Sequence, residues 1–111
     1  MAAKFVVSMR SNGEFQFNLK AGNGQVILTS EGYSAKASCL NGVESVRTNS
    51  QIDARYLRKA SGNGKPYFNL TAGNGQIIGT SEMYADDSGR DNGIASVKAN
   101  APIAALDDPT A

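Results

Sequence analysis

The chain has 111 residues, of which 41% are hydrophobic and 19% are charged, so its composition is that of a folded globular domain and excludes a disordered tail. Eleven Lys and Arg residues oppose ten Asp and Glu residues, which leaves a formal net charge of +1. That balance gives no electrostatic reason to expect nucleic acid or an anionic membrane as the main partner.

Cys39 is the only cysteine, so no intramolecular disulfide can form and a reducing compartment is the natural setting. The apolar stretch at residues 5–9 is far too short for a signal peptide, and Arg10 interrupts it. No segment approaches the length of a membrane span. We therefore expect a cytoplasmic protein that has no membrane partner.

The chain is a tandem duplication. A shift of 51 residues aligns residues 5–51 with residues 56–102 without a gap, and 20 of the 47 aligned positions are identical. Because a solenoid needs about three repeats, we expect the two copies to meet across an approximate twofold axis, as identical subunits would. This predicts one domain over residues 1–111, with repeats at about 4–54 and 55–106, a flexible tail at 107–111, and a monomer.

Each repeat begins with three predicted strands. In the first repeat these are an apolar run at Phe5–Met9, an alternating segment at Phe15–Ala21 and a second apolar run at Val26–Thr29. Asn12-Gly13 lies between the first two, and Asn-Gly is typical of tight hairpins in which both central residues have positive φ. Gly22-Asn23-Gly24 joins the next two. We therefore predict a three-stranded antiparallel meander in each repeat.

A helix is predicted after the third strand, where apolar and small residues fall at helical spacing, such as Cys39, Val43 and Val46. Ser34 is expected to cap the first helix, and Pro102 to end the second. The Asn-Gly pair at Asn41-Gly42, repeated 51 residues later, is unusual inside a helix because glycine costs about 1 kcal/mol there. Its repetition predicts a close contact between the helix backbone and the sheet.

The segments "FNLKAGNGQVILTSEGY" and "NGVESVRTN", with "YFNLTAGNGQIIGTSEMY" and "DNGIASVKANAP" in the second copy, resemble the YegP-like family of small bacterial proteins of unknown function. The resemblance covers about Lys4 to Leu106. It implies an α+β fold of two β-β-β-α-β units, in which the units share an antiparallel sheet and exchange their C-terminal strands. Those strands would be Ile52–Arg55 and Ile103–Leu106. The resemblance implies no activity, cofactor or site residue.

The glycine-rich turns are not expected to bind phosphate. A phosphate-binding loop leads from a strand into the N-terminus of a helix, where backbone N–H groups face the anion. Here each Gly-Asn-Gly segment leads into another predicted strand. Hairpin turns account for these glycines.

The Thr-Ser-Glu-x-Tyr segments are the better candidates for a ligand site. Glu31 and Tyr33 recur in the second copy as Glu82 and Tyr84, and the two glutamates are the only carboxylates that both copies share. One interpretation is a symmetric pair of polar pockets, each with a carboxylate, a phenol and two hydroxyls. The alternative, which we favour, is structural: the glutamate accepts backbone N–H groups near the helix start, and the tyrosine packs with its hydroxyl satisfied.

Catalytic chemistry has few candidates. The chain has no histidine, so it lacks the commonest general base and metal ligand. Cys39 is replaced by Arg90 in the second copy, and we expect it to pack as a small apolar residue. The aspartates near residues 86–91 and 107–108 lack the spacing of a Ca²⁺ loop, and the pair at 86–87 is expected to favour the positive end of the second helix. We predict no cofactor, no metal and no catalytic residue.

A small basic group lies around the first hairpin of the second copy, with two tyrosines nearby. Basic side chains beside exposed aromatic rings are what a single-strand nucleic-acid binder needs. The first copy does not repeat the group, because Glu14 stands where the second copy has a lysine. The residues of this candidate patch are Arg55, Arg58, Lys59 and Lys65.

Three functions remain open on the sequence. The first, which we favour, is a non-catalytic binding or interaction module for a protein or small ligand, because the positions shared by both copies are mainly turn formers, core residues and small residues. The second is weak nucleic-acid binding through the Arg55–Lys65 region. The third is an enzyme that uses Glu31 and Glu82 as acid or base, for which those carboxyl groups would have to be buried in a cleft.

Overall fold

A computed structural model describes residues 2–110, which form one sheet, two long helices and a short 3-10 helix. The predicted α+β fold of two repeats is confirmed, and both repeats form the β-β-β-α part of the expected β-β-β-α-β unit. In chain order the elements are β1 (Lys4–Met9), β2 (Phe15–Lys20), β3 (Val26–Thr29), α1 (Lys36–Asn49), η1 (Asp53–Arg55), β4 (Tyr56–Ala60), β5 (Pro66–Thr71), β6 (Ile77–Thr80), α2 (Asp87–Asn100) and β7 (Ala105–Asp107).

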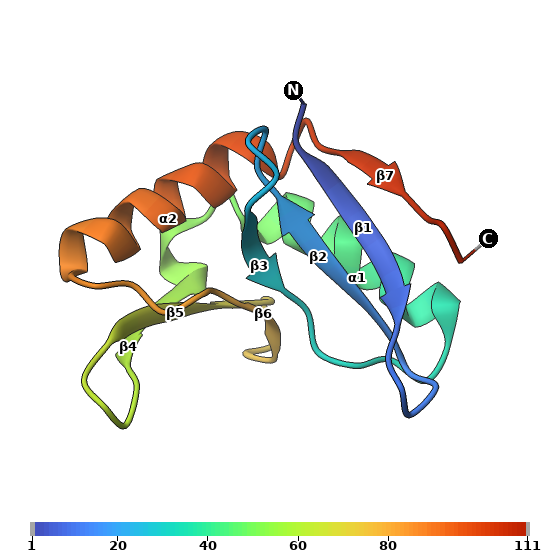
Figure 1. The fold of residues 1–111 in the computed structure, drawn as a ribbon, viewed down its shortest axis with the longest axis horizontal. Helices are drawn as coiled ribbons and strands as arrows, with labels where there is room; N and C mark the ends of the chain where they lie inside the picture. Colours follow the sequence, from blue (N-terminus) through green and yellow to red (C-terminus); the bar gives the residue numbers. More distant parts are fainter. Residues whose placement is uncertain (1, 111) are drawn as a thin grey trace.

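The strands lie in the order β4-β5-β6-β3-β2-β1-β7 (Figure 1). Each repeat supplies an antiparallel meander, and the two meanders join where β3 pairs antiparallel with β6. At that seam Thr29 lies opposite Thr80, its own counterpart in the other repeat. This is the arrangement expected when two equal units meet across an approximate twofold axis.

The seam also explains one difference between the repeats. Leu28 in β3 is fully buried, and its counterpart in β6 is Gly79. A Cβ atom added to Gly79 would lie 2.6 Å from Leu28 Cγ, well inside van der Waals contact. Because the twofold axis brings these equivalent positions together, one leucine occupies the space that two would have to share.

The hairpin turns are confirmed, but their conformation differs from the expected one. Positive φ occurs at four glycines, Gly13, Gly24, Gly64 and Gly75, and at no other type of residue in the part of the chain that the structure describes. In the first turn the N–H of Gly13 donates to Arg10 O at 2.9 Å, and the N–H of Arg10 donates to Glu14 O at 2.7 Å. This is a type I turn followed by a left-handed glycine. Asn12 does not need positive φ, because the central residues of a type I turn have negative φ, and its Oδ1 accepts the N–H of Glu14.

Each helix covers strands of both repeats. α1 packs on β2 of its own repeat and on β5 and β6 of the other, whereas α2 packs on β5 and on β3. The side chains beneath the helices are the fully buried ones, including Phe5, Phe17, Leu19, Phe68 and Leu70. Burying both helices therefore requires both repeats, and one continuous core results.

The two helices begin differently. Asp86 caps α2, with its Oδ1 accepting the N–H of Gly89 at 2.7 Å, so the expectation that acidic residues favour this helix start is confirmed. The prediction that Ser34 caps α1 is wrong, because the cap position is Ala35, which makes no side-chain bond. A bridge between Tyr33 and Phe15 keeps the chain extended up to that point. α2 ends at Asn100, shortly before Pro102, as predicted.

β7 is the exchanged C-terminal strand that the resemblance implied, and it lies at Ala105–Asp107 instead of Ile103–Leu106. It follows α2 in the second repeat but pairs in parallel with β1 of the first, which makes the sheet mixed. The expected first-repeat strand at Ile52–Arg55 is not formed, since Asp53–Arg55 is a 3-10 helix. The reason is covalent: this segment runs directly into β4, and parallel pairing with β4 would require a crossover of a dozen or more residues. The tandem connection of the repeats therefore permits the pairing of β7 with β1 and prevents the equivalent pairing of the first repeat's last segment with β4.

The predicted tail at 107–111 makes contacts at its start, which includes the last residue of β7. Lys4 Nζ lies 3.5 Å from Asp107 Oδ2, and Lys36 Nζ lies 2.9 Å from Asp108 Oδ2. The flexibility of residues 107–111 stays a prediction. Among the helices within residues 2–110, none combines the length and apolarity that crossing a membrane requires.

Candidate functional site

The Ser residues of the Thr-Ser-Glu-x-Tyr segments complete the sheet. Ser30 is buried at the end of β3, where its Oγ accepts the N–H of Phe17 at 2.8 Å and donates to Glu31 O at 2.8 Å. Ser81 makes the same two bonds with Phe68 and Glu82 in the second repeat. These hydroxyls replace backbone partners at the strand ends, so they are committed to the fold.

The Thr hydroxyls of the same segments are also occupied. Thr29 Oγ1 accepts from Asn18 Nδ2 at 2.9 Å, and Thr80 Oγ1 accepts from Asn69 Nδ2 at the same distance. These bonds argue against the less favoured interpretation, in which each pocket includes two hydroxyls. The side chains of these segments that remain for a ligand are the glutamate and the tyrosine.

Both tyrosines lie between the sheet and a helix glycine. Tyr33 stacks on Phe17 with a ring-centroid distance of 6.4 Å, and a Cβ added to Gly42 of α1 would lie 2.5 Å from its Oη atom. Tyr84 has the same relation to Phe68 and to Gly93 of α2. The predicted close approach at the helix Asn-Gly pairs is thus confirmed, and its partner is the tyrosine ring.

This environment keeps the tyrosine hydroxyls protonated. Burial raises the pKa of Tyr33, and the neighbouring Cys39 and Glu31 raise it further. Burial likewise raises the pKa of Tyr84, with a smaller effect from Glu82. At neutral pH each phenol is therefore able both to donate and to accept a hydrogen bond.

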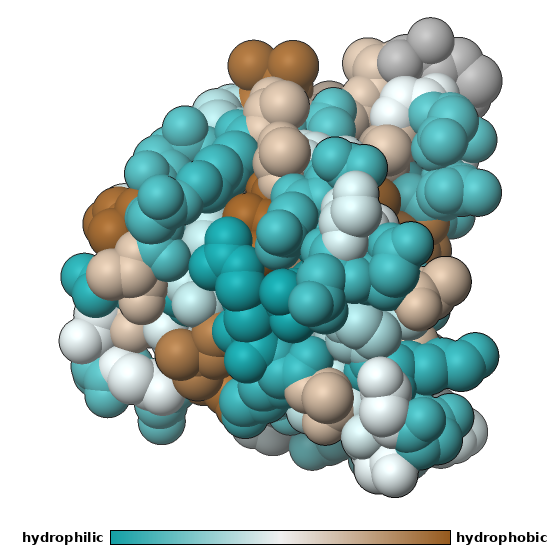
Figure 2. Space-filling model, turned by 90° about the vertical axis from the view of Figure 1, so that its left-hand side faces the viewer, coloured by the Kyte–Doolittle hydropathy of each residue, from teal (hydrophilic) through white to brown (hydrophobic). Residues whose placement is uncertain are grey.

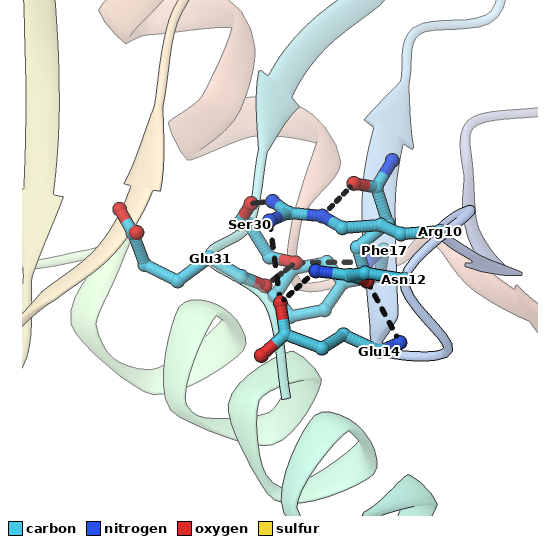
Figure 3. A network of polar contacts seen from close by, with 7 residues as sticks. Arg10, Asn12, Glu14, Phe17, Ser30 and Glu31 are labelled. Atoms are coloured by element: carbon cyan, nitrogen blue, oxygen red, sulfur yellow. Dashed lines mark hydrogen bonds and ion pairs between the residues drawn. The ribbon is translucent and has the colours of Figure 1, made fainter. Parts of the chain in front are cut away.

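The glutamates are exposed, and within residues 2–110 no backbone N–H donates to either carboxylate, so the favoured interpretation that they accept backbone N–H groups near the helix start is wrong. Figure 3 shows that the side chain of Glu31 extends away from the polar cluster formed by Arg10, Asn12 and Glu14. In that cluster Arg10 Nη1 lies 3.7 Å from Glu14 Oε1, and Asn12 Nδ2 donates to the same oxygen at 3.0 Å. Arg10 is consequently engaged elsewhere, and the carboxylate of Glu31 faces solvent.

Two clefts accompany the two glutamate–tyrosine pairs. One cleft, of about 560 Å³, lies between three parts of the chain: the pair Glu82 and Tyr84, the adjoining face of α2, and the β2–β3 hairpin of the other repeat. Its lining also includes Asn23, Gln25, Val26, Ile27, Asn92 and Ser96. The other, of about 530 Å³, is lined by Glu31, Tyr33, Gly75, Gln76, Ile77 and Ile78. We call them the Glu82 cleft and the Glu31 cleft.

The clefts occupy equivalent positions in the two repeats. Each combines the glutamate and tyrosine of one repeat with the Gly-Asn-Gly hairpin of the other: Val26 and Ile27 in one cleft correspond to Ile77 and Ile78 in the other. In each cleft the glutamate is the only charged residue among the described lining residues. Each cleft therefore presents one negative charge, one phenol and a partly apolar wall.

The contribution of the hairpins was missed by the sequence reasoning. Their glycines were correctly assigned to turns, but the turns also form one wall of each cleft. No local signal reveals this, because the hairpin and the tyrosine of one cleft belong to different repeats. The 51-residue symmetry was the one available clue, since it required any such site to occur twice.

The two clefts are not identical. Met83 lines the Glu82 cleft, and the corresponding residue of the first repeat is Gly32, which packs beside the side chains of Arg10 and Glu14. The Glu82 cleft consequently has the more apolar rim.

The other candidate residues are held by burial or by ion pairs. Cys39 is fully buried, and burial raises the pKa of its thiol, so it packs as a small apolar side chain as expected. Its counterpart Arg90 lies 3.6 Å from Asp87 and 3.5 Å from Asp91. Within residues 2–110 the acidic and cysteine side chains form no cluster able to hold a metal ion.

Two of the four basic residues of the candidate nucleic-acid patch, Arg55 and Arg58, are bonded to other side chains of the protein. Arg55 Nε donates to Asn49 Oδ1 at 3.0 Å, and Arg58 Nε lies 3.2 Å from Asp91 Oδ1. Lys59 and Lys65 are exposed. Among the residues that the structure describes, Lys59 and Lys65 have no ion-pair partner, and two ammonium groups are a small footprint for a polyanion.

The chain matches the family described as "Domain of unknown function (DUF1508)" twice, over residues 11–56 and 61–108. It belongs to this family. The two matches coincide with the two repeats, which confirms the tandem duplication and the suspected YegP-like relationship.

Relatives match over nearly the whole chain. A UPF0339 protein from Shewanella oneidensis is 54% identical over 110 residues, covering 99% of this chain and 100% of the relative. The UPF0339 protein YegP of Escherichia coli O157:H7 has the same identity and coverage, and a UPF0339 protein encoded in the ptx operon 5′ region of Stutzerimonas stutzeri is 58% identical over 104 residues, 94% of each chain. These names assign no activity.

Solved structures of two relatives have the same fold. The solution NMR structure of the Shewanella oneidensis UPF0339 protein superposes with a TM-score of 0.91 at 54% identity, over 97% of this chain and 92% of that one. The solution NMR structure of E. coli yegP, described as a protein of unknown function, superposes with a TM-score of 0.92 at 52% identity, over 98% of this chain and 94% of that one.

Proposed function

We propose that the protein is a non-catalytic binding module of the bacterial cytoplasm, and that each of its two clefts holds a positively charged group of a ligand or partner protein. The observation that carries the proposal is the pairing of an exposed carboxylate with a protonated phenol at two equivalent places, Glu31 with Tyr33 and Glu82 with Tyr84. A duplicated chain that retains both pairs is suited to binding two similar groups.

The chemistry of the clefts favours a cation on an apolar stem. The single carboxylate attracts an ammonium or guanidinium group, and charge-assisted hydrogen bonds are the stronger kind. The phenol provides a further acceptor, and the wall formed by Val26 and Ile27, or by Ile77 and Ile78, provides apolar contact. Lysine and arginine side chains have this character, as do simple alkylamines.

The non-catalytic part of the proposal rests on the position of the carboxylates. General acid–base catalysis at neutral pH usually relies on a carboxyl group held in a buried site that adjusts its pKa. Glu31 and Glu82 are exposed. The neighbouring hydroxyls of Ser30 and Ser81 are bonded to the backbone, which argues against a nucleophilic role.

Titration of the ¹⁵N-labelled protein with arginine amide, followed by NMR, tests the proposal. We expect saturable shifts at amides around both clefts, and the same concentration of butyrate should leave those amides unchanged. Glu82→Gln should weaken binding at the Glu82 cleft by about three- to tenfold, the range expected for an exposed charge-assisted contact, and leave the Glu31 cleft unaffected. Glu31→Gln should do the reverse.

Glu44→Gln is the matched control, because Glu44 is an exposed carboxylate on α1 that pairs with Arg47 outside both clefts. It removes the same charge and should leave both titrations unchanged. Equal responses to arginine amide and butyrate, or equal losses in all three variants, would contradict the proposal.

A further inference from the structure

The two outer edges of the sheet differ. The edge of β1 is covered by β7, whereas β4 has β5 as its one strand neighbour in the described part of the chain. β4 runs from Tyr56 to Ala60, and all of its side chains except Tyr56 are exposed. We propose that this edge binds an extended acidic segment of another protein, which adds to the sheet as a parallel strand.

β7 shows how such a strand binds to this fold. It pairs in parallel with β1, and the N–H of Ala105 donates to Ala3 O at 3.3 Å. An ion pair of 3.5 Å between Lys4 and Asp107 accompanies the backbone pairing. The same chain therefore contains one filled strand site, at the edge of the first repeat.

The second repeat contains the equivalent site without its strand. A shift of 51 residues places Arg55, Tyr56 and Leu57 where β1 has the three residues that pair with β7. The segment of the first repeat that corresponds to β7 would fill this site, but it forms the 3-10 helix and the first residue of β4 instead. No other segment within residues 2–110 pairs with this edge, so a strand that fills it comes from outside the chain.

The backbone groups that point outward follow from the same equivalence. Because Ala3 O faces β7, alternate residues of β1 turn their N–H and C=O groups toward that edge. The equivalent residues of β4 are Tyr56, Arg58 and Ala60. The N–H of Tyr56 already donates to Asp53 O, so the donors available to a partner begin at Arg58.

The charges on β4 select the partner. Lys59 is exposed, and Arg58 lies beside it on the strand with its guanidinium 3.2 Å from Asp91. Positive side chains favour an acidic strand and oppose pairing of β4 with β4 of a second copy. Leu57, 42% exposed, adds a small apolar contact. Figure 2 shows the side of the molecule on which β4 and the start of α2 lie, and its surface is mainly hydrophilic with separate apolar patches. Backbone pairing and charge, rather than a broad apolar face, therefore support binding here.

One further position refines the partner. In the filled site, Asp108 pairs with Lys36 at 2.9 Å just beyond β7. The counterpart of Lys36 is Asp87, which would repel a second acid at that place. The favoured segment thus has three consecutive residues: an apolar residue in the place of Leu106, an acidic residue in the place of Asp107, and then a neutral or basic residue.

A peptide copied from residues 102–110 with Asp108→Ser is the probe, titrated into the ¹⁵N-labelled full-length chain. We expect saturable shifts at the amides of residues 57–60. A second peptide that also carries Asp107→Asn should bind about three- to fivefold more weakly, the size of an exposed ion pair. Lys59→Glu in the protein should have a similar effect, whereas Lys65→Glu, which changes the net charge equally on an exposed turn residue, should have little.

Three results would overturn the proposal. The first is no change at residues 57–60 at millimolar peptide. The second is a set of shifts confined to β1 and its surroundings, which would mean that the peptide only replaces the chain's own β7. The third is concentration-dependent association of the protein through β4 without peptide, which would assign the edge to a second copy. The cleft amides report on the other site in the same spectra, so failure here is distinguishable from failure of the proposed cleft function.

Discussion

The contact between Leu28 and Gly79 predicts where the joined sheet is least tolerant of change. In Gly79→Ala the new Cβ would lie 2.6 Å from both Cγ and Cδ2 of Leu28, whereas carbon atoms pack at about 3.5–4.0 Å. Leu28 is fully buried and has little room to move aside. We expect the variant to lose about 1–3 kcal/mol of unfolding free energy, the usual cost of overpacking a core. Alanine in a strand would otherwise gain roughly 0.5–1 kcal/mol over glycine.

The reverse change tests the same contact by removing the leucine. Leu28→Ala leaves a cavity at the seam and should cost about 2–5 kcal/mol. Because the two positions are related by the approximate twofold axis, the double variant Leu28→Ala/Gly79→Leu moves the large side chain into the vacated space. It should be more stable than the sum of the single changes predicts, by roughly 1–3 kcal/mol of coupling.

Urea unfolding followed by circular dichroism measures these free energies directly. Gly62→Ala is the control, since Gly62 is exposed, has no positive φ and would place its Cβ in open space. It should change stability by no more than about 0.5 kcal/mol. If Gly79→Ala proved as stable as the parent, or the double variant lost the full sum, the steric account of the seam would be refuted.

Three further outcomes follow from individual contacts. Gly42→Ala should destabilise the protein by about 1–3 kcal/mol in the same assay, although alanine normally favours a helix, because its Cβ would lie 2.5 Å from Tyr33 Oη. Ser30→Ala should cost about 1–3 kcal/mol, since the buried N–H of Phe17 loses its acceptor; no loss would mean that water replaces the hydroxyl. Burial chiefly raises the pKa of Tyr56 above the unfolded value of about 10. The protonated phenol therefore contributes fully to the free energy of unfolding below about pH 10, and this contribution is lost as the pH rises further. The stability of Tyr56→Phe should fall less steeply above pH 10 than that of the parent, and an equal slope would contradict this assignment.

Much of the local structure could be predicted because it depends on short-range preferences. The turn glycines Gly13 and Gly24 mark hairpins, since only glycine adopts positive φ at little cost. The boundary at Val26–Thr29 was predicted correctly from a short apolar run between turn signals. The start of α1 was not, because a bridge from Tyr33 to β2, which no local pattern reveals, delays the helix by one residue.

The candidate site was predictable in its residues but not in its form. Repetition identified Glu31 and Tyr33 together with Glu82 and Tyr84, and these are the side chains found in the two clefts. The serines and threonines beside them were included in the prediction but are bonded within the sheet. Whether a hydroxyl completes a strand or faces a ligand depends on the partner strand, so the motif alone could not separate these roles.

The sequence by itself determined that the chain consists of two like halves, where the strands, turns and helices lie within each half, and that any site built on the shared residues would occur twice. The tertiary structure alone decided which hairpin faces which tyrosine, that a single leucine fills the seam, and that one outer edge is covered while the other is open. Local elements follow from the conformational preferences of neighbouring residues. Contacts between the halves depend instead on how two similar units are arranged about one approximate twofold axis. The symmetry is broken where the chain passes from the first repeat to β4, because the linking segment cannot also form the strand equivalent to β7.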